Sequence, residues 1–505
     1  MKRNTTYLTL SMIAAVLIGL GSCSDAFLNP DPKGTLMEET YYSNPDEALA
    51  GLVSVYDPIG WQTAVSYLNF GAVNSASDDH VAGGGGPNDM ETWQRWSNYT
   101  LNESQGPQQD YWNRNFTGVS RANIFIQKLE AGIPGLSEAV TARYLAEAKF
   151  LRGYFYFDLV RLFRNIPFYL EPLTTDNMRE QVQVDPTVVY AQIEQDLKDA
   201  LAVLPPTVPA ATEGGRATKG MAQALLGKVY LYQKKWTDAA RELAVVNGTP
   251  GGTSEYGYRL LENFEDVFRP DNKFHAESIL EIVCSQGGAR TWDHWGQFYG
   301  NVATTMFGPR GYSGPYYYSG WSFCPITQEL YDLLHYDPRF KATVADLDSL
   351  EKNGIAQYEK GYMNTGWFIQ KYAPLVEFAA TSGVRELNYP QDYIEIRLAD
   401  TYLMEAEALI EDGQGGGPGT RAYQLLNAVR GRVGLNPIEA TLDNIFLERR
   451  KELATEGHRW YDLVRSGRAA TALASRGFVA GKHEVLPIPY AELLNTQLVQ
   501  HDAYK

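Results

Sequence analysis

The stretch "LLGKVYLYQKKWTDAARELAVV", Leu225–Val246, indicates the fold of this chain. Apolar residues recur at helical spacing on both sides of the polar turn "QKK", which predicts two short helices packed against each other. Leu226-Gly227-x-x-Tyr230 matches the core of a tetratricopeptide repeat, in which the glycine lets the paired helices approach and the tyrosine fills the groove between them. Ala239 and Ala240 are the small residues of the second helix.

A second helix pair is predicted where "DYIEIRLADTYLMEAEALI" and "RAYQLLNAVRGRVGL" flank the turn "EDGQGGGPGT". Residues 71–106 and about 248–381 show no sustained period, and the second segment is rich in Gly, Tyr and Trp. We therefore predict a mostly α-helical repeat scaffold with a large irregular part, and long segments of this kind usually carry function. Further helices are predicted at Pro45–Trp61, Ser137–Arg164, Pro186–Val203, Thr218–Gln233 and Trp236–Val246.

The N-terminus has the features of an export signal. Lys2 and Arg3 precede the apolar stretch Tyr7–Leu20, which is short for a bilayer core of about 30 Å but suits a signal-peptide core. The following Leu-Gly-Ser-Cys23 resembles a bacterial lipobox, whose cysteine takes the lipid. The alternative is an ordinary signal peptide that happens to contain a cysteine.

Acylation of Cys23 would anchor the mature chain to a membrane, since several acyl chains exceed the roughly two lipid signals that stable anchoring needs. We expect residues 1–22 to be the signal peptide, residues 23–45 the lipidated N-terminus and tether, and residues 46–505 a single domain. Cys284 and Cys324 remain, and they either form a disulfide or are both free and buried.

The net charge argues against nucleic acid as a partner. Residues 1–22 contain two basic and no acidic residues, so their removal takes the formal charge from −16 to −18. Nucleic-acid binding needs clustered Lys and Arg, so we expect no nucleic-acid partner.

Signals for cofactors and metals are weak. "GGGGPND", Gly83–Asp89, lacks the Gly-Lys-Ser/Thr ending of a phosphate loop, and the seven His residues show no zinc-site spacing. We therefore expect no cofactor and no catalytic metal. Asp78 and Asp79 are one half of a glycosidase acid/base pair only if a partner carboxylate exists, and no single partner stands out.

The segment "LERRKELATEGHRWYDLVRSG", Leu447–Gly467, allows two interpretations. One makes Glu456, His458 and Asp462 an active site. The other is an ion-pair lattice with Trp460 and Leu463 packed inward, which we favour. It sets the acids Glu448, Glu452 and Glu456 against the bases Arg449, Arg450, Arg459 and Arg465.

Aromatic residues in the irregular segments are the best candidates for ligand binding, because no helical period requires them to be core. Flat rings beside polar residues suit a sugar, whose C–H face packs on a ring while polar side chains meet its hydroxyls. The alternative is that the rings pin long loops to the scaffold. We predict Trp96, Trp292, Trp295, Tyr299 and Trp321 as stacking residues, and Asp78, Asn98 and Asp293 as hydroxyl partners.

Nearly the whole chain resembles one family, the SusD/RagB-like nutrient-binding lipoproteins of the Bacteroidetes outer membrane. The resemblance rests on the order and spacing of nine stretches, namely "FLNPDPKG", "SASDDHVAGG", "RYLAEAKFLRGYFYFDLVRLFRNIPF", "VYAQIEQDLKDALAVLP", "GRATKGMAQALLGKVYLYQKKWTDAA", "IEIRLADTYLMEAEALI", "LLNAVRGRVGL", "LERRKELATEGHRWYDLVRSG" and "VLPIPYAELLNTQLVQHDAY".

The resemblance implies a single domain of about four tetratricopeptide-like helix pairs with an irregular ligand-binding half. It also implies a non-catalytic protein at the cell surface that captures an oligosaccharide or other nutrient and delivers it to a SusC-like TonB-dependent transporter. The ligand itself and the residues that touch it do not follow from the resemblance. Two alternatives stay open, namely a surface glycoside hydrolase and a scaffold that serves only the transporter.

Overall fold

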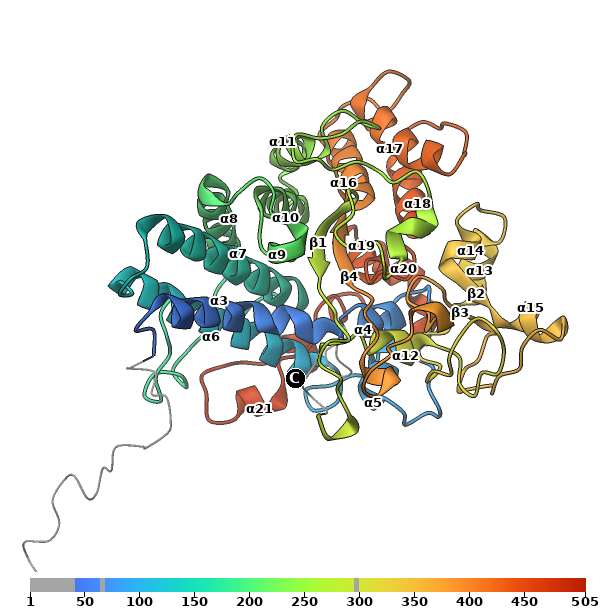
Figure 1. Cartoon of the computed structure of the whole chain (residues 1–505), viewed down its shortest axis with the longest axis horizontal. Coiled ribbons are helices and arrows are strands. Elements are labelled where there is room, and N and C mark those ends of the chain that lie inside the picture. Colours follow the sequence, from blue (N-terminus) through green and yellow to red (C-terminus); the bar gives the residue numbers. More distant parts are fainter. Residues whose placement is uncertain (1–40, 64–68, 295–298) are drawn as a thin grey trace, which may run out of the picture.

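The computed structural model describes residues 41–63, 69–294 and 299–505. The expectations for the signal peptide, for Cys23 and for most of the tether lie outside these residues. Long helices form one half of the molecule and pack side by side in chain order (Figure 1). They are α3 Pro45–Gly60, α6 Gln108–Ala131, α7 Glu138–Phe163, α8 Pro186–Val203, α10 Lys219–Tyr232, α11 Trp236–Asn247, α16 Leu398–Glu411, α17 Arg421–Arg432 and α18 Leu442–Glu452.

Local chemistry explains where several of these helices begin. The side chains of Ser137, Thr218 and Thr420 each accept a hydrogen bond from the backbone N–H three residues on, at the start of α7, α10 and α17. Such caps satisfy backbone donors that have no partner in the first turn. The helices predicted from hydrophobic spacing are confirmed to within one residue at most ends.

The helix pair predicted from Leu225–Val246 is α10 and α11. A β-carbon at Gly227 would lie 2.6 Å from Cγ of Leu243 in α11, so only glycine permits this close approach. Tyr230 and Ala239 are buried as expected. The packing of this pair is therefore confirmed, whereas the number of repeats stays a prediction.

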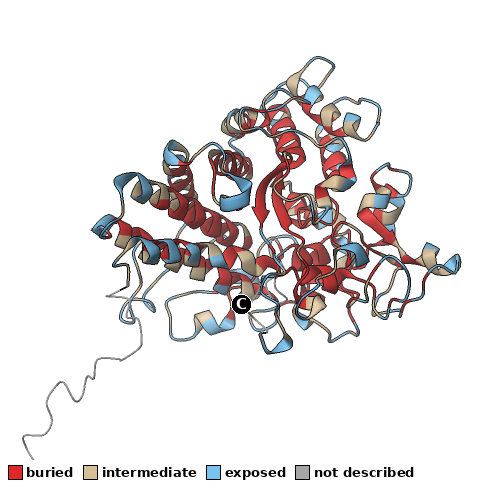
Figure 2. Ribbon diagram, in the orientation of Figure 1, coloured by how far each residue is buried: buried red, intermediate tan, exposed pale blue. Residues whose placement is uncertain are grey.

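Two short antiparallel strand pairs occur in the irregular part. β1, Ser278–Ile282, pairs with β4, Tyr393–Arg397, and the pair lies near the middle of the molecule, where β1 contacts α10 and β4 contacts α16 (Figure 1). β2, Val344–Asp346, pairs with β3, Trp367–Ile369. Buried residues fill the inner sides of the long helices and both strands of the β1–β4 pair (Figure 2).

The expectation that residues 71–106 form one long loop is wrong. The helix α4, Asn69–Ala76, enters this segment and α5, Glu91–Ser97, lies within it. Both helices are too short for a 3.6-residue period to stand out. The other short helices are α9 Ala210–Glu213, α12 Ala303–Phe307, α13 Gln328–Leu334, α14 Phe340–Thr343, α15 Leu347–Lys352, α19 Arg459–Arg465, α20 Ala469–Ala472 and α21 Tyr490–Leu493.

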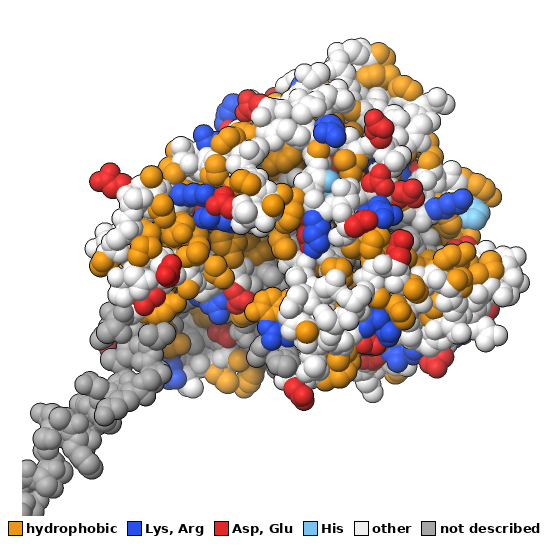
Figure 3. Space-filling model, viewed as in Figure 1, with side chains coloured by type: hydrophobic (Ala, Val, Ile, Leu, Met, Phe, Trp, Pro, Cys, Tyr) orange, Lys and Arg blue, Asp and Glu red, His pale blue; other side chains and the backbone are white. Residues whose placement is uncertain are grey.

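The two remaining cysteines do not form a disulfide. Cys284 and Cys324 are both free and buried, which decides between the two alternatives. On the face that Figure 3 shows, basic side chains are scattered among acidic ones.

Candidate functional site

Two of the predicted rings lie at the surface on a segment that follows β1. The side chains of Trp292 and Tyr299 are 50% and 53% exposed. The backbone N–H of Ser285 donates to the carbonyl of Tyr299, and the N–H of Asn301 donates to the carbonyl of Tyr389 at 2.8 Å. The described ends of this segment are thus held against each other and against the chain just before β4.

Arginine side chains cover one face of two rings. The guanidinium of Arg290 lies 4.2 Å from the ring centre of Tyr299, and that of Arg385 lies 3.9 Å from the ring centre of Tyr318. Such cation–π contacts stabilise a ring in one orientation. Tyr318 is half-buried, so part of its ring stays accessible to a ligand.

Trp321 is connected to the same region through backbone contacts. It is half-buried, and its N–H donates to the carbonyl of Thr305 at 2.9 Å. The hydroxyl of Thr305 in turn donates to the carbonyl of Glu386 at 3.0 Å, one residue after Arg385. The N–H of Val384 donates to the carbonyl of Arg290 at 2.8 Å, which joins the segment of Tyr299 to that of Arg385. We call Trp292, Tyr299, Tyr318 and Trp321, whose segments these contacts join, the ring cluster.

Only part of the ring cluster could be predicted from the sequence. Tyr318 is one of several tyrosines in "GYSGPYYYSGW", and no local pattern separates it from Tyr317, which is buried. Arg290 and Arg385 are far apart in sequence and carry no motif. Which ring is accessible depends on tertiary contacts.

Burial contradicts Trp96 as a ligand residue, whereas Asp78 stays a prediction although arginine already binds it. Trp96 is 1% exposed and packs edge-on against Trp460 at a ring distance of 5.1 Å, so a sugar cannot reach it. The carboxylate of Asp78 accepts two hydrogen bonds of 2.8 Å from Arg459, so it is already neutralised. Trp96 is core because α5 turns this side chain inward.

The remaining predicted residues have different positions. Asp293 is exposed beside Trp292 and stays a candidate. Asn98 is exposed at the end of α5, where its carbonyl lies near Gly477. Trp295 lies outside the described residues.

A laminarin-binding SusD-like protein of known structure is 48% identical to this chain, with a TM-score of 0.88, and the match covers 92% of this chain and 100% of that protein. This chain belongs to the SusD/RagB family. Profiles described as "SusD family" and "Starch-binding associating with outer membrane" match residues 276–479 and 51–231.

Other SusD-like proteins are similar over nearly the whole chain. Surface glycan-binding protein A from Bacteroides thetaiotaomicron, solved in complex with laminarihexaose, is 26% identical with a TM-score of 0.79, covering 90% of this chain and 99% of that one. A SusD-like protein of Formosa agariphila is 26% identical over 95% of this chain and 96% of its own length. The predicted family and the mostly helical fold are therefore confirmed.

In this SusD/RagB member, the charged segment Leu447–Gly467 is an ion-pair lattice. Glu456, His458 and Asp462 are at most 8% exposed. Burial lowers the pKa of His458 to about 4, and the arginines around Asp462 lower its pKa although burial opposes them. The carboxylates are held ionised by arginines, which fits a structural role better than proton transfer.

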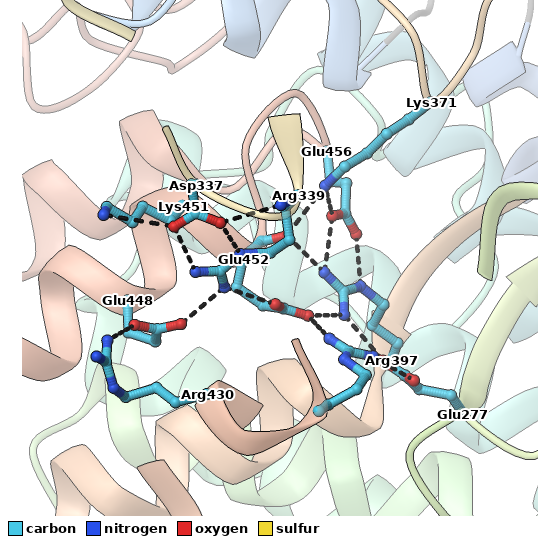
Figure 4. A network of polar contacts seen from close by, with 11 residues as sticks. Glu277, Asp337, Arg339, Lys371, Arg397, Arg430, Glu448, Lys451, Glu452 and Glu456 are labelled. Carbon is cyan, nitrogen blue, oxygen red and sulfur yellow. Dashed lines mark hydrogen bonds and ion pairs between the residues drawn. The ribbon is translucent and has the colours of Figure 1, made fainter. Parts of the chain in front are cut away.

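The lattice was predicted correctly in kind but with the wrong partners. Glu448, Glu452 and Glu456 bind bases from other parts of the chain rather than from their own helix (Figure 4). Asp462, in contrast, pairs with Arg449 and Arg465 of the segment itself. The helix α18 ends at Glu452, so Glu456 leaves the helical face on which it was placed. The partners of Glu448, Glu452 and Glu456 are Arg339, Lys371, Arg397, Arg430 and Arg432.

Bases of the segment also bind acids from other parts of the chain. Arg449 pairs with Asp400 at 2.8 Å, and Arg450 pairs with Asp79 at 2.6 Å. Arg459 holds Asp78, as described above. Both members of the Asp78–Asp79 pair are therefore bound to arginine, which argues against the pair as half of a glycosidase site.

Within residues 41–63, 69–294 and 299–505, no group of three or more His, Cys, Asp and Glu side chains is arranged to hold a metal ion. In the same ranges, no helix is both long enough and apolar enough to span a bilayer.

Proposed function

We propose that this chain is a non-catalytic glycan-binding protein of the cell surface, and that its ligand is a laminarin-type glucan. The observation that carries the proposal is the ring cluster, with its accessible rings and two stacked arginines. The glucan class is supported by the relatives titled as laminarin-binding and as bound to laminarihexaose. The absence of catalysis is supported by relatives that are named for binding.

The ring cluster suits capture followed by release. A pyranose places its C–H face on an aromatic ring, while the guanidinium groups of Arg290 and Arg385 hold Tyr299 and Tyr318 in place beneath it. Pre-positioned rings reduce the entropy lost on binding. Stacking on a few rings gives modest affinity, and fast dissociation lets the ligand pass onward.

Isothermal titration with laminarihexaose tests the site. Two rings at about 0.5–1.5 kcal/mol each predict that Trp292→Ala/Tyr299→Ala weakens binding roughly five- to 150-fold. Tyr336→Ala is the matched control, because this tyrosine is 93% exposed at the end of α13. Equal affinity of the double variant and the control, with both folded, would remove the site assignment.

Anchoring and delivery form the second part of the proposal. We infer that Cys23 carries the lipid, that the protein is held at the outer membrane, and that it passes the glycan to a SusC-like TonB-dependent transporter. The lipobox-like sequence and the family support this. Cys23→Ala should leave the domain folded but release it from membranes that lack the transporter, and continued membrane association would contradict the anchor.

A reducing-end assay and the same titration together separate the competing functions. Slow release of reducing ends, abolished by one carboxylate substitution, would indicate a hydrolase. No heat with any oligosaccharide, together with co-purification with a barrel partner, would indicate a scaffold.

A further inference from the structure

Both ends of the segment that carries Trp292 and Tyr299 are attached to the short stretch 389–392, just before β4. At one end, the N–H of Cys284 donates to Oδ1 of Asp392 at 2.7 Å. At the other end, Asn301 contacts Tyr389 as described above, and its side-chain amide donates to the carbonyl of Gln391 at 2.9 Å. The position of 389–392 therefore governs where both ends of the segment lie.

Asp392 and Lys273 together hold Cys284. The ammonium of Lys273 donates to Oδ1 of Asp392 and, at 2.6 Å, to the carbonyl of Cys284. The next residue, Ser285, donates its N–H to the carbonyl of Tyr299. A shift of the Asp392 carboxylate would thus reach the backbone of Tyr299 within two hydrogen bonds.

A second carboxyl group, that of Glu281 in β1, lies near Asp392, and both residues line the same small cavity. Both groups are buried, with Glu281 5% and Asp392 7% exposed. Oδ2 of Asp392 is buried. Within the described residues, it accepts no hydrogen bond from a backbone N–H or from a side chain that always carries its proton. The carboxyl group of Glu281 accepts the N–H of Phe274 at 3.0 Å. A proton on Glu281 would supply the donor that Oδ2 lacks.

The local charges favour that proton. Burial, followed by the charge of Asp392, raises the pKa of Glu281 to about 8. With Glu281 neutral, the single charge of Asp392 is matched by Lys273. Of the other groups near the pair, Arg269 is bound to the exposed Asp271.

Two further groups near the pair are uncharged at pH values near 8. Burial raises the pKa of the Tyr372 hydroxyl well above its ordinary value and that of the Cys284 thiol to about 12. Loss of the Glu281 proton would therefore leave two buried carboxylates sharing one ammonium, which is unfavourable.

We propose that Glu281 and Asp392 are a positioning pair which, by sharing one proton, holds Cys284 and Ser285 so that Tyr299 is presented to the glycan. The inference rests on the proposed function, since it concerns the same ring cluster. Neither residue touches the ligand. They act through the backbone that carries the ring.

The first test is the pH profile of laminarihexaose affinity. The wild-type protein should bind laminarihexaose at least about fivefold more weakly at pH 9 than at pH 6.5. A fivefold change is the lower end of typical coupling between two sites. The midpoint of the change should lie near pH 8. Glu281→Gln keeps a donor toward Asp392 and should bind equally at both pH values. The exposed Glu262→Gln is the matched control and should follow the wild type. A flat wild-type profile, or a Glu281→Gln profile that follows the wild type, would overturn the inference.

The second test needs no ligand. Amide exchange of Cys284 and Ser285 is compared between the wild type and Glu281→Gln at the same pH, which cancels the intrinsic exchange rate. The two proteins should match at pH 6.5, and at pH 9 the wild type should exchange faster. Equal protection of these amides in the two proteins at pH 9 would overturn the inference. If the exchange difference is present but laminarihexaose does not bind at any pH, only the proposed function is overturned.

Discussion

Arg397→Met is the sharpest test of the ion-pair lattice. Arg397 is fully buried in β4 and donates to Glu277 at 2.9 Å, to Glu452 at 2.7 Å and to Glu456 at 2.8 Å (Figure 4). Although burial alone would raise the pKa of Glu452, nearby arginines including Arg397 keep it well below its ordinary value. Methionine fills much of the same space but removes the positive charge that the carboxylates of Glu277, Glu452 and Glu456 share.

The expected cost follows from the burial of the pair. Removing one partner of a buried ion pair typically costs about 3–5 kcal/mol, because the remaining charge is left uncompensated. Arg241→Met is the matched control, since Arg241 also contacts two acids, Asp238 and Glu242, but its side chain is 59% exposed. An exposed pair contributes about 0–1 kcal/mol. The two variants should therefore differ by at least about 2 kcal/mol in the free energy of unfolding.

Urea unfolding followed by circular dichroism measures both values, with midpoint shifts converted through a common slope. Adding Glu452→Gln to Arg397→Met should recover part of the loss, because it removes one carboxylate while Arg339 and Arg432 keep Glu448 and Glu277 as partners. An Arg397→Met protein within about 1 kcal/mol of Arg241→Met would refute the view that the buried lattice stabilises the fold.

Three further outcomes are expected. Burial lowers the pKa of His458 from 6.5 to about 4, so between these pH values the imidazole takes up a proton in the unfolded chain but not in the folded one. The free energy of unfolding should therefore fall by up to about 3 kcal/mol as the pH drops from 6.5 toward 4. His458→Gln should flatten that part of the pH profile in urea unfolding, and an unchanged slope would contradict it. Burial also raises the thiol pKa of Cys284 to about 12 and that of Cys324 well above its ordinary value, so at pH 8 neither thiol should react with a disulfide reagent until denaturant is added. Gly227→Val should cost about 1–3 kcal/mol in thermal or urea unfolding through overpacking against Leu243, and an unchanged midpoint would show that the helices can separate at no cost.

The long helices could be predicted because their apolar spacing is a local property. Leu151, Tyr154, Phe155, Leu159 and Leu162 recur at three and four residues, and all of them are buried in α7. The short helices were missed, since seven or eight residues show too little of a period. The spacing of three between Trp93 and Trp96 was the one local sign that both rings share a buried face.

The site was predicted less completely, because exposure is not a local property. Trp96 and Trp292 both stand in segments without a clear helical period, yet Trp96 packs against Trp460 and Trp292 lies at the surface. Each has another tryptophan three residues away, Trp93 for Trp96 and Trp295 for Trp292, so this spacing does not separate the two. The arginines that stack on Tyr299 and Tyr318 were missed for the same reason.

The family, the mostly helical scaffold and the approach of α10 and α11 at Gly227 follow from the amino-acid sequence, because each depends on spacing along the chain. Which charges pair and which rings face solvent follows only from the folded arrangement. Arg397 lies 55 residues from Glu452 and 120 from Glu277 along the chain, and their contact depends on how β4, α18 and the start of β1 pack. The energy of a buried charge depends on its neighbours in space, and these are set only when the chain has folded.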